Sequence, residues 1–250
     1  MPVELALTPD SRWDVPFAEL AAACGDVGFS GLGVVGDRVD AETKPVLDAA
    51  GLRCHEVLAL LVDDDVPAML ANAERLAHIA ASIDAPWVLS YYGSEVTGAI
   101  ADGVVEAARI VSDAGVGLAV EFSPLGPVDT IASGLEVLEI ARRGGRAGLL
   151  IDTWHFGTGD STWDDLEWVP LDDIAYVQLS DARPVPGRES YGRALPGDGF
   201  LDLARFAGIL LDRGWEGTVS VEVLTRELHG LSAAETAQRT YASSADLWQA

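Results

Sequence analysis

Short apolar runs alternate along the chain with amphipathic segments, from the N-terminal residues to the C-terminal ones. The runs have the length of strands, whereas the segments between them carry apolar residues at three- and four-residue spacing, which is typical of helices. The pattern predicts eight strands, at Val3–Leu7, Gly31–Val35, Arg53–Leu60, Trp87–Tyr91, Gly117–Phe122, Gly148–Asp152, Ala175–Leu179 and Thr218–Val223.

The amphipathic segments predict the intervening helices. Glycine follows several of them, and a glycine at that place can adopt the left-handed conformation that ends a helix. We expect such ends at Gly51, Gly115, Gly144 and Gly214. The clearest helices are predicted at Val66–Ile83, Val96–Ala114, Thr130–Arg143, Leu201–Arg213 and Ala233–Trp248.

Strands that alternate with helices favour an α/β protein with a parallel sheet. Eight strands are also the number that closes a (β/α)₈ TIM barrel, which takes roughly 250 residues. The chain has 250 residues and no linker-like stretch, so we expect a single TIM-barrel domain over residues 1–250. In that arrangement the last helix packs beside the first. A doubly wound open sheet is the main alternative, because periodicity alone does not separate the two.

Oxygen-bearing side chains stand at or near the ends of four predicted strands. Glu121 ends GVGLAVE, Asp152 ends AGLLID, Gln178 lies in IAYVQLSD, and Glu222 ends TVSVE. Adjacent parallel strands would bring these oxygens to one mouth of a barrel. Carboxylate and amide oxygens suit Mn²⁺, Mg²⁺ or Co²⁺. The four residues therefore predict the ligands of one divalent metal ion.

Each of these residues has a simpler explanation when taken alone. Glu121 and Glu222 could pair with arginines, Asp152 could cap the following helix, and Gln178 could be structural. His155, three residues after Asp152, could be a core histidine. The joint occurrence of four oxygen ligands at four strand ends favours the metal site.

Two further segments bear on the site. The connection from Ser180 to Phe200 is long, is expected to be irregular, and carries Arg193, which can clamp an anionic group. The segment Gly31–Gly36 matches G-x-G-x-x-G, but its glycines fall inside a predicted strand instead of following one. Dinucleotide binding is therefore not expected.

Composition excludes several classes of function. The net charge of −24 repels phosphate backbones, so we expect no nucleic-acid partner and no membrane surface. Lys44 is the only lysine and stands away from the strand ends, which argues against a Schiff-base enzyme. Two cysteines, Cys24 and Cys54, and the lack of a signal-like or membrane-spanning segment predict a cytoplasmic protein. A homo-oligomer is compatible with all of these features.

The stretches AVEFSPLGPVDTI, LLIDTWHF, YVQLSDA, R-A-L-P-G-D-G-F and VSVEVLTREL resemble the xylose isomerase-like, or sugar phosphate isomerase/epimerase, superfamily of TIM barrels. The resemblance implies one divalent metal held by Glu121, Asp152, Gln178 and Glu222. It also implies that His155 and Arg193 bind substrate. Glutamine at position 178 is similar to the hydroxypyruvate isomerase and 3-dehydroshikimate dehydratase branches, whereas epimerases often have histidine there.

The function implied is metal-assisted proton transfer next to the carbonyl of a sugar or polyhydroxy ketone, through an enediolate. Glu121 and Glu222 would be the catalytic pair, one removing the proton and the other returning it. A lyase of the 3-dehydroshikimate dehydratase kind is the alternative, since it shares the first step. A catalytically inactive barrel that binds a sugar is a second alternative.

Overall fold

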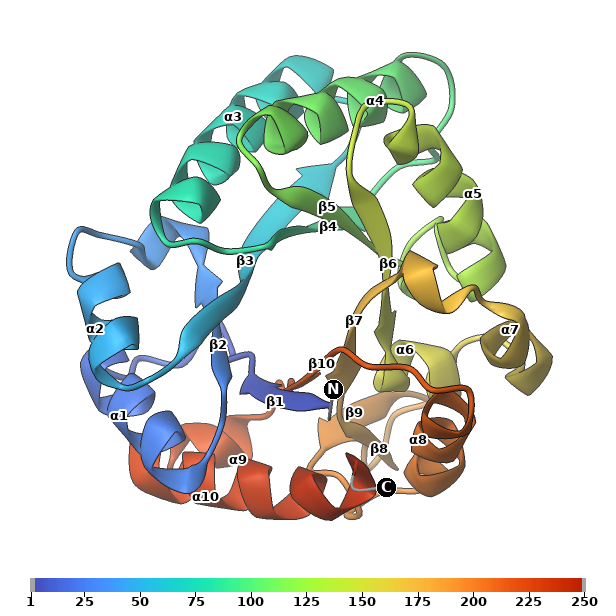
Figure 1. Cartoon of the computed structure of the whole chain (residues 1–250). Coiled ribbons are helices and arrows are strands. Elements are labelled where there is room, and N and C mark those ends of the chain that lie inside the picture. The colour runs from blue at the N-terminus through green and yellow to red at the C-terminus, as the bar shows by residue number, and fades with distance from the viewer. Residues whose placement is uncertain (1–2, 249–250) are drawn as a thin grey trace.

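Eight parallel strands close into a barrel in the computed structural model, which describes residues 3–248. The strand order around the barrel is β1-β10-β7-β6-β5-β4-β3-β2, and Figure 1 views it along the barrel axis. The TIM-barrel prediction is therefore confirmed. The barrel strands are β1 (Glu4–Leu7), β2 (Gly31–Val35), β3 (Arg53–Val62), β4 (Trp87–Tyr92), β5 (Gly117–Glu121), β6 (Ala147–Asp152), β7 (Ile174–Leu179) and β10 (Thr218–Val221).

Helices surround the barrel, and the last α-helix packs against the first (Figure 1). Phe29 and Tyr241 make an edge-to-face ring contact at that junction, with centroids 5.1 Å apart. The α-helices are α1 (Phe17–Val27), α2 (Thr43–Ala49), α3 (Val66–Ser82), α4 (Gly98–Asp113), α5 (Ile131–Arg142), α6 (Thr153–Thr158), α7 (Trp163–Trp168), α8 (Leu203–Asp212), α9 (Arg226–His229) and α10 (Ala233–Ser244). Short 3₁₀ turns are η1 (Gly36–Arg38), η2 (Leu171–Asp173) and η3 (Ala245–Trp248).

Glycine ends three of the predicted helices in the expected way. Gly51, Gly115 and Gly214 have φ angles of 69°, 81° and 79°, which lie in the left-handed region. The prediction for Gly144 is wrong, because its φ angle is not positive. A Cβ atom at Gly144 would lie 1.9 Å from the carbonyl oxygen of Val105. This glycine therefore permits the close approach of α5 to α4.

The connection after β7 is more ordered than the sequence suggests. Strands β8 (Asp181–Pro184) and β9 (Tyr191–Ala194) form an antiparallel hairpin, so the expectation of an irregular segment is wrong over this part. Ala182 pairs with Arg193 in the hairpin. The Asp181 carboxylate accepts hydrogen bonds from the backbone N–H groups of Gly197, Gly199 and Leu201. These bonds fix the loop that follows the hairpin.

The interior of the barrel is filled by side chains. Leu89, Ala119, Leu150 and Tyr176 form a small apolar cluster there, separate from the larger core between the strands and the helices. The glycines of the G-x-G-x-x-G match lie in β2 and at its end, as expected from their place in an apolar run. A Cβ atom at Gly31 would lie 3.3 Å from the Ala6 side chain, so this glycine permits close packing of neighbouring strands.

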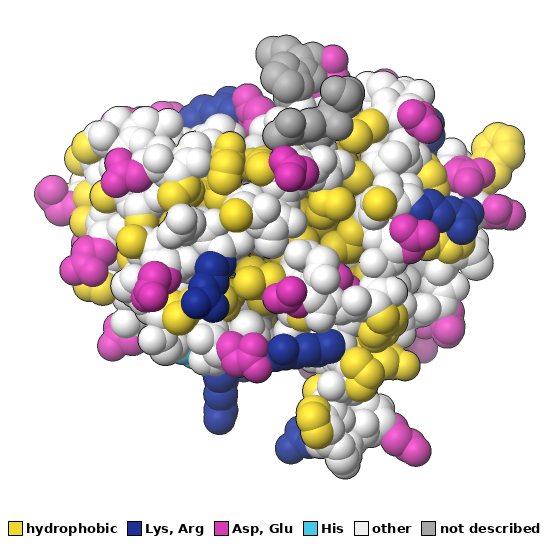
Figure 2. Space-filling model, turned by 90° about the horizontal axis from the view of Figure 1, so that it is seen from below, with side chains coloured by type: hydrophobic (Ala, Val, Ile, Leu, Met, Phe, Trp, Pro, Cys, Tyr) yellow, Lys and Arg dark blue, Asp and Glu magenta, His cyan; other side chains and the backbone are white. Residues whose placement is uncertain are grey.

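The surface agrees with the acidic composition. Figure 2 shows Asp and Glu side chains scattered over one face, with hydrophobic side chains between them and few Lys or Arg side chains. Among residues 3–248, no helix combines the length and the apolarity needed to cross a bilayer.

Candidate active site

The four predicted ligands lie on four neighbouring barrel strands. Glu121 ends β5, Asp152 ends β6, Gln178 lies in β7, and Glu222 follows the last residue of β10. Asp152 is the register partner of Gln178 across β6 and β7. All four side chains are therefore presented at the carboxyl ends of the strands, the end at which TIM-barrel enzymes build their sites. A cavity of about 590 Å³ opens there, and Glu121, Glu222 and His155 are among its lining residues.

Arg193, from β9, reaches into the centre of this group. Its Nη1 donates to Asp152 Oδ2 at 2.7 Å and to Ser180 Oγ at 2.9 Å, and its Nη2 lies 3.3 Å from Glu222 Oε2. The side chain is 8% exposed, so both ion pairs are buried. Burial opposes the charge of Arg193, but the carboxylates outweigh burial and raise the pKa of the guanidinium. The hairpin thus supplies a positive charge between two carboxylates.

Asp152 caps the following helix, which was the simpler explanation from the sequence, and it also forms an ion pair with Arg193. Its Oδ1 accepts from the backbone N–H groups of Trp154 and His155 at 2.7 Å and 3.1 Å, which caps α6. Its Oδ2 is directed to Arg193. Burial alone would raise the pKa of Asp152, but the charge of Arg193 and the hydrogen bonds from Arg193 and from the His155 backbone outweigh it, and the pKa lies below its ordinary value. The carboxylate is therefore charged and held at both oxygens.

His155 lies next to one of the proposed ligands. It is in the first turn of α6, and its Nε2 is 3.3 Å from Glu121 Oε1. Its Nδ1 is 3.2 Å from Ser123 Oγ. One ligand atom each from Glu121, Asp152 and His155 lies within 4.8 Å of the others, a spacing that could hold a metal ion. His155 is thus a fifth candidate ligand beside the predicted four.

The side chains of Gln178 and Glu222 contact each other, and Glu222 also contacts Arg193. The Gln178 Nε2 lies 3.4 Å from Glu222 Oε1, and the Gln178 Oε1 is buried with no hydrogen-bond partner among the described residues. A buried amide oxygen without a partner is costly unless a ligand completes it. Burial raises the pKa of Glu222 well above its ordinary value, although the charge of Arg193 opposes this. The donor set therefore fits a divalent cation.

A carboxylate that the sequence did not single out lies deeper in the barrel. Glu56, in β3, is fully buried and accepts hydrogen bonds from the hydroxyls of Thr8 and Tyr176. Burial raises the pKa of Glu56 to about 7, against the opposing effect of these hydrogen bonds. The adjacent His55 is also buried. The signal in the sequence was the pair of polar residues, His55 and Glu56, inside an otherwise apolar strand.

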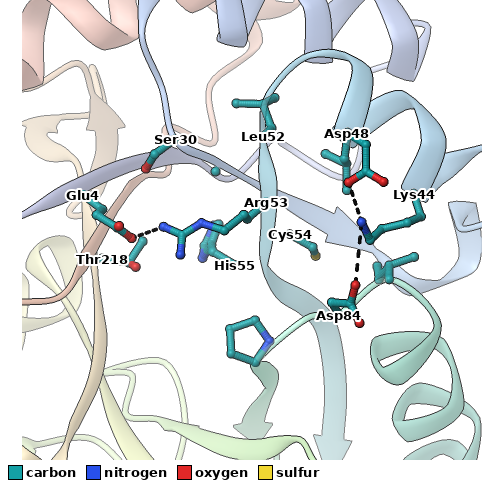
Figure 3. A pocket seen from close by; sticks show the side chains of 14 residues that line it. Glu4, Ser30, Lys44, Asp48, Leu52, Arg53, Cys54, His55, Asp84 and Thr218 are labelled. Atoms are coloured by element: carbon teal, nitrogen blue, oxygen red, sulfur yellow. Dashed lines mark hydrogen bonds and ion pairs between the residues drawn. The ribbon is translucent and has the colours of Figure 1, made fainter.

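A second cavity, of about 350 Å³, lies at the opposite end of the barrel, where several strands begin. Figure 3 shows that its cations face carboxylates of the same protein: Arg53 pairs with Glu4, and Lys44 lies between Asp48 and Asp84. The only lysine is therefore held far from the mouth that carries Glu121. This agrees with the argument against Schiff-base chemistry.

Comparison with known proteins places the chain in a family. An inosose isomerase from Halalkalibacterium halodurans is 32% identical over 146 residues, which cover 57% of this chain and 51% of that protein. The chain thus spans about half the length of the curated relatives it matches.

Solved structures share the fold at low identity. A zinc-bound IOLI protein superposes with a TM-score of 0.83 at 18% identity, covering 98% of both chains. A probable 3-DHS dehydratase from Bacillus anthracis gives a TM-score of 0.72 at 14% identity, covering 94% of this chain and 98% of that one. Residues 21–248 match the family described as xylose isomerase-like TIM barrel. The chain belongs to the xylose isomerase-like TIM barrel family.

Proposed function

We propose that this protein is a divalent-metal-dependent isomerase or epimerase that moves a proton next to the carbonyl of a small polyhydroxy ketone. The observation that carries the proposal is the placement of Glu121 and Glu222 on the outer strands of the arc β5-β6-β7-β10, with Asp152 and Gln178 between them. This placement would put a carboxylate on each side of a substrate bound at the centre. The inosose isomerase relatives support a ketone of this class.

The metal would be held by Glu121, Asp152, Gln178 and Glu222, with His155 as a further donor. The partnerless Gln178 Oε1 and the close grouping of Glu121, Asp152 and His155 support this assignment. When bound, the ion would polarise the substrate carbonyl and stabilise the enediolate as a Lewis acid.

The two glutamates would move the proton. One carboxylate removes the proton from the carbon next to the carbonyl, and the other carboxyl returns a proton to the enediolate. General acid–base transfer by positioned side chains contributes typically about 10²–10⁴-fold to the rate.

His155 and Arg193 would orient the substrate. The Nε2 of His155 lies next to Glu121, so it can donate to the substrate oxygen whose neighbouring carbon reacts. Arg193 keeps Asp152 and Glu222 in place, while the cavity that it lines receives the polar end of the substrate. Exposed apolar side chains of Tyr91, Tyr191 and Leu224 line the same cavity and would cover the C–H faces of a ring.

A dehydratase is the second candidate, and the structural likeness to the probable 3-DHS dehydratase favours it. It would use the same removal of a proton next to a carbonyl. A hydroxyl on the next carbon would then leave as water, with the proton supplied by the second glutamate. The two candidates differ in product and not in the first step.

The test is solvent exchange. Purified protein is stripped with a chelator, reloaded with Mn²⁺, Mg²⁺, Co²⁺ or Zn²⁺, and incubated in D₂O with inosose and with ketohexoses. Deuterium incorporation next to the carbonyl is followed by NMR, and dehydroshikimate is assayed in parallel for a new aromatic absorbance. We expect metal-dependent exchange that falls by at least about 10²-fold in Glu121→Gln and in Glu222→Gln.

Ser90→Ala is the matched control, because the buried Ser90 hydroxyl bonds to the Ala119 carbonyl and the Tyr92 hydroxyl, and among the described residues it bonds to none of the four ligands. Exchange that survives in both glutamine variants would refute the acid–base assignment. A metal-loaded protein that binds these ketones without exchange or loss of water would instead be an inactive sugar-binding barrel.

A further inference from the structure

An irregular register in β3 places two consecutive polar side chains inside the barrel. Leu32 of β2 pairs with Cys54, and Val34 pairs with Val57, so β3 uses one residue more than β2 over this interval. Such a bulge turns a side chain that regular alternation would direct to the other face. His55 and Glu56 consequently both lie within reach of Gly33: a Cβ atom there would be 3.2 Å from His55 Nε2 and 2.9 Å from Glu56 Oε1.

The Glu56 carboxylate is costly where it lies, because it is fully buried and has no cation as a direct partner among the described residues. His55, its neighbour, has a pKa lowered to about 3 by burial and is therefore neutral. Both carboxylate oxygens accept hydroxyl hydrogens, one from Thr8 and the other from Tyr176. Glu56 therefore acts as an acceptor on both sides, and its remaining acceptor capacity faces Gln178.

The contacts with Glu56 and Glu222 set the orientation of the Gln178 side-chain amide. Its Nε2 lies 3.4 Å from both oxygens of Glu56 and 3.4 Å from Glu222 Oε1. An amide nitrogen donates and an amide oxygen only accepts, so the reversed orientation would place an acceptor against two carboxyl groups. The same orientation leaves Oε1 as the atom without a partner.

We propose that Glu56 is a positioning residue, which holds the Gln178 amide nitrogen towards β3 so that the amide oxygen is free to meet the bound cation. This inference rests on the proposed function only in naming the cation as the ligand of that oxygen. Glu56 acts on the site from beneath, through Gln178, and is not itself a catalytic residue.

The test compares Glu56→Gln with the wild type in two measurements. In the chelator-treated protein, the side-chain NH₂ resonances of Gln178 are observed in ¹H–¹⁵N spectra and assigned by their absence in Gln178→Met. We expect Glu56→Gln to shift these resonances and to speed their exchange with solvent. In the second measurement, Co²⁺ is titrated and followed by its visible absorption. We expect about 10–100-fold weaker binding and an altered spectrum, as is usual when a group that orients a ligand is removed.

A double-mutant cycle isolates the route through Gln178. In the Gln178→Met background, Glu56→Gln should change Co²⁺ affinity by less than about twofold, because the group that Glu56 orients is already gone. Ser90→Ala is the control in both measurements and should match the wild type. Tyr176→Phe, which removes one hydroxyl from Glu56, provides a second probe if Glu56→Gln does not fold, and a several-fold weaker affinity is expected.

The outcomes separate the two proposals. Unchanged Gln178 resonances and unchanged Co²⁺ affinity in Glu56→Gln, or in Tyr176→Phe where that variant stands in, overturn the positioning role. A wild type that binds no Co²⁺ overturns the proposed function, and the positioning role is then decided by the amide resonances alone.

Discussion

Arg193, which lines the cavity, donates a hydrogen bond of 2.7 Å from Nη1 to Asp152 Oδ2, and both side chains are buried. The same guanidinium lies 3.3 Å from Glu222. In a protein without metal, this single arginine is the main positive charge facing the clustered carboxylates. Its position gives a prediction that links stability to metal binding.

Replacing Arg193 by methionine should destabilise the metal-free protein by about 3 kcal/mol or more, because it leaves buried carboxylates without their partner. For a chain of this size, that loss lowers Tm by roughly 6–12 °C. Mn²⁺ should restore more of the Tm in Arg193→Met than it adds to the wild type, since the cation replaces the lost charge. Differential scanning calorimetry with and without Mn²⁺ measures both effects.

The control for this prediction is Arg183→Met. Arg183 is an arginine of the same hairpin, but its exposed side chain pairs with the exposed Glu227. Its removal should change Tm by no more than about 1 °C. An equal response of the wild type and Arg193→Met to Mn²⁺ would contradict the view that metal and arginine balance the same carboxylates.

His155→Ala decides whether this histidine binds substrate or metal. If it binds substrate, KM should rise by about tenfold or more, while metal analysis still finds one ion per chain. The exposed His78 on α3 gives the control His78→Ala, which should alter neither quantity. Loss of metal from His155→Ala would make the histidine a ligand together with Glu121 and Asp152, as their spacing allows.

Asp181→Asn should loosen the segment that carries Arg193. The carboxylate accepts four backbone N–H groups, those of Ala182, Gly197, Gly199 and Leu201. An asparagine amide would direct its NH₂ at two of these donors, so we expect a loss of about 2–3 kcal/mol in unfolding free energy and at least a tenfold lower kcat/KM. Guanidinium unfolding and steady-state kinetics measure these changes. Asp198→Asn, at an exposed position of the same loop, should have no effect on either.

Asp10 makes part of the stability depend on pH. Burial would raise its pKa, but the hydrogen bonds from Arg12 and His229 outweigh burial and lower the pKa to about 2, from an ordinary value of 3.8. A carboxyl group with a lowered folded-state pKa stabilises the protein above its unfolded pKa and loses that contribution as pH falls through the folded pKa.

The Asp10→Asn variant should therefore be less stable than the wild type by about 1–2 kcal/mol at pH 7 and at pH 5. The difference should fall to about half by pH 3 and should vanish towards pH 2. Chemical unfolding at these pH values gives the difference directly. A gap that stays constant down to pH 3 would show that hydrogen-bond geometry, and not charge, makes the contribution of Asp10.

The fold and four of the clustered side chains could be predicted from the local pattern of apolar and polar residues. Apolar runs located all eight barrel strands to within a few residues, because a strand buried between helices and barrel interior leaves a continuous apolar signature. Glu121, Asp152, Gln178 and Glu222 were found because each interrupts such a signature near the carboxyl end of its strand. The strand order that makes them neighbours came from the parallel βα alternation.

Other parts of the site depend on contacts between segments far apart in sequence. The β8–β9 hairpin was missed because Pro184, Pro186 and Gly187 obscure its strand pattern, and the pairing of Asp181 with Ala194 depends on the folded loop. Glu56 was missed because regular alternation would direct only one of His55 and Glu56 inward. The extra residue in β3 is set by its register against β2, which local sequence does not reveal.

The lack of a side chain at Gly33 has a consequence for anyone who redesigns this barrel. An alanine there would collide with Glu56, and a displaced Glu56 would release the amide of Gln178. Positions 33, 56 and 178 therefore form a trio that should change together among natural homologues. Grafting the glutamine alone onto another scaffold would transfer the amide oxygen without the glutamate that orients it.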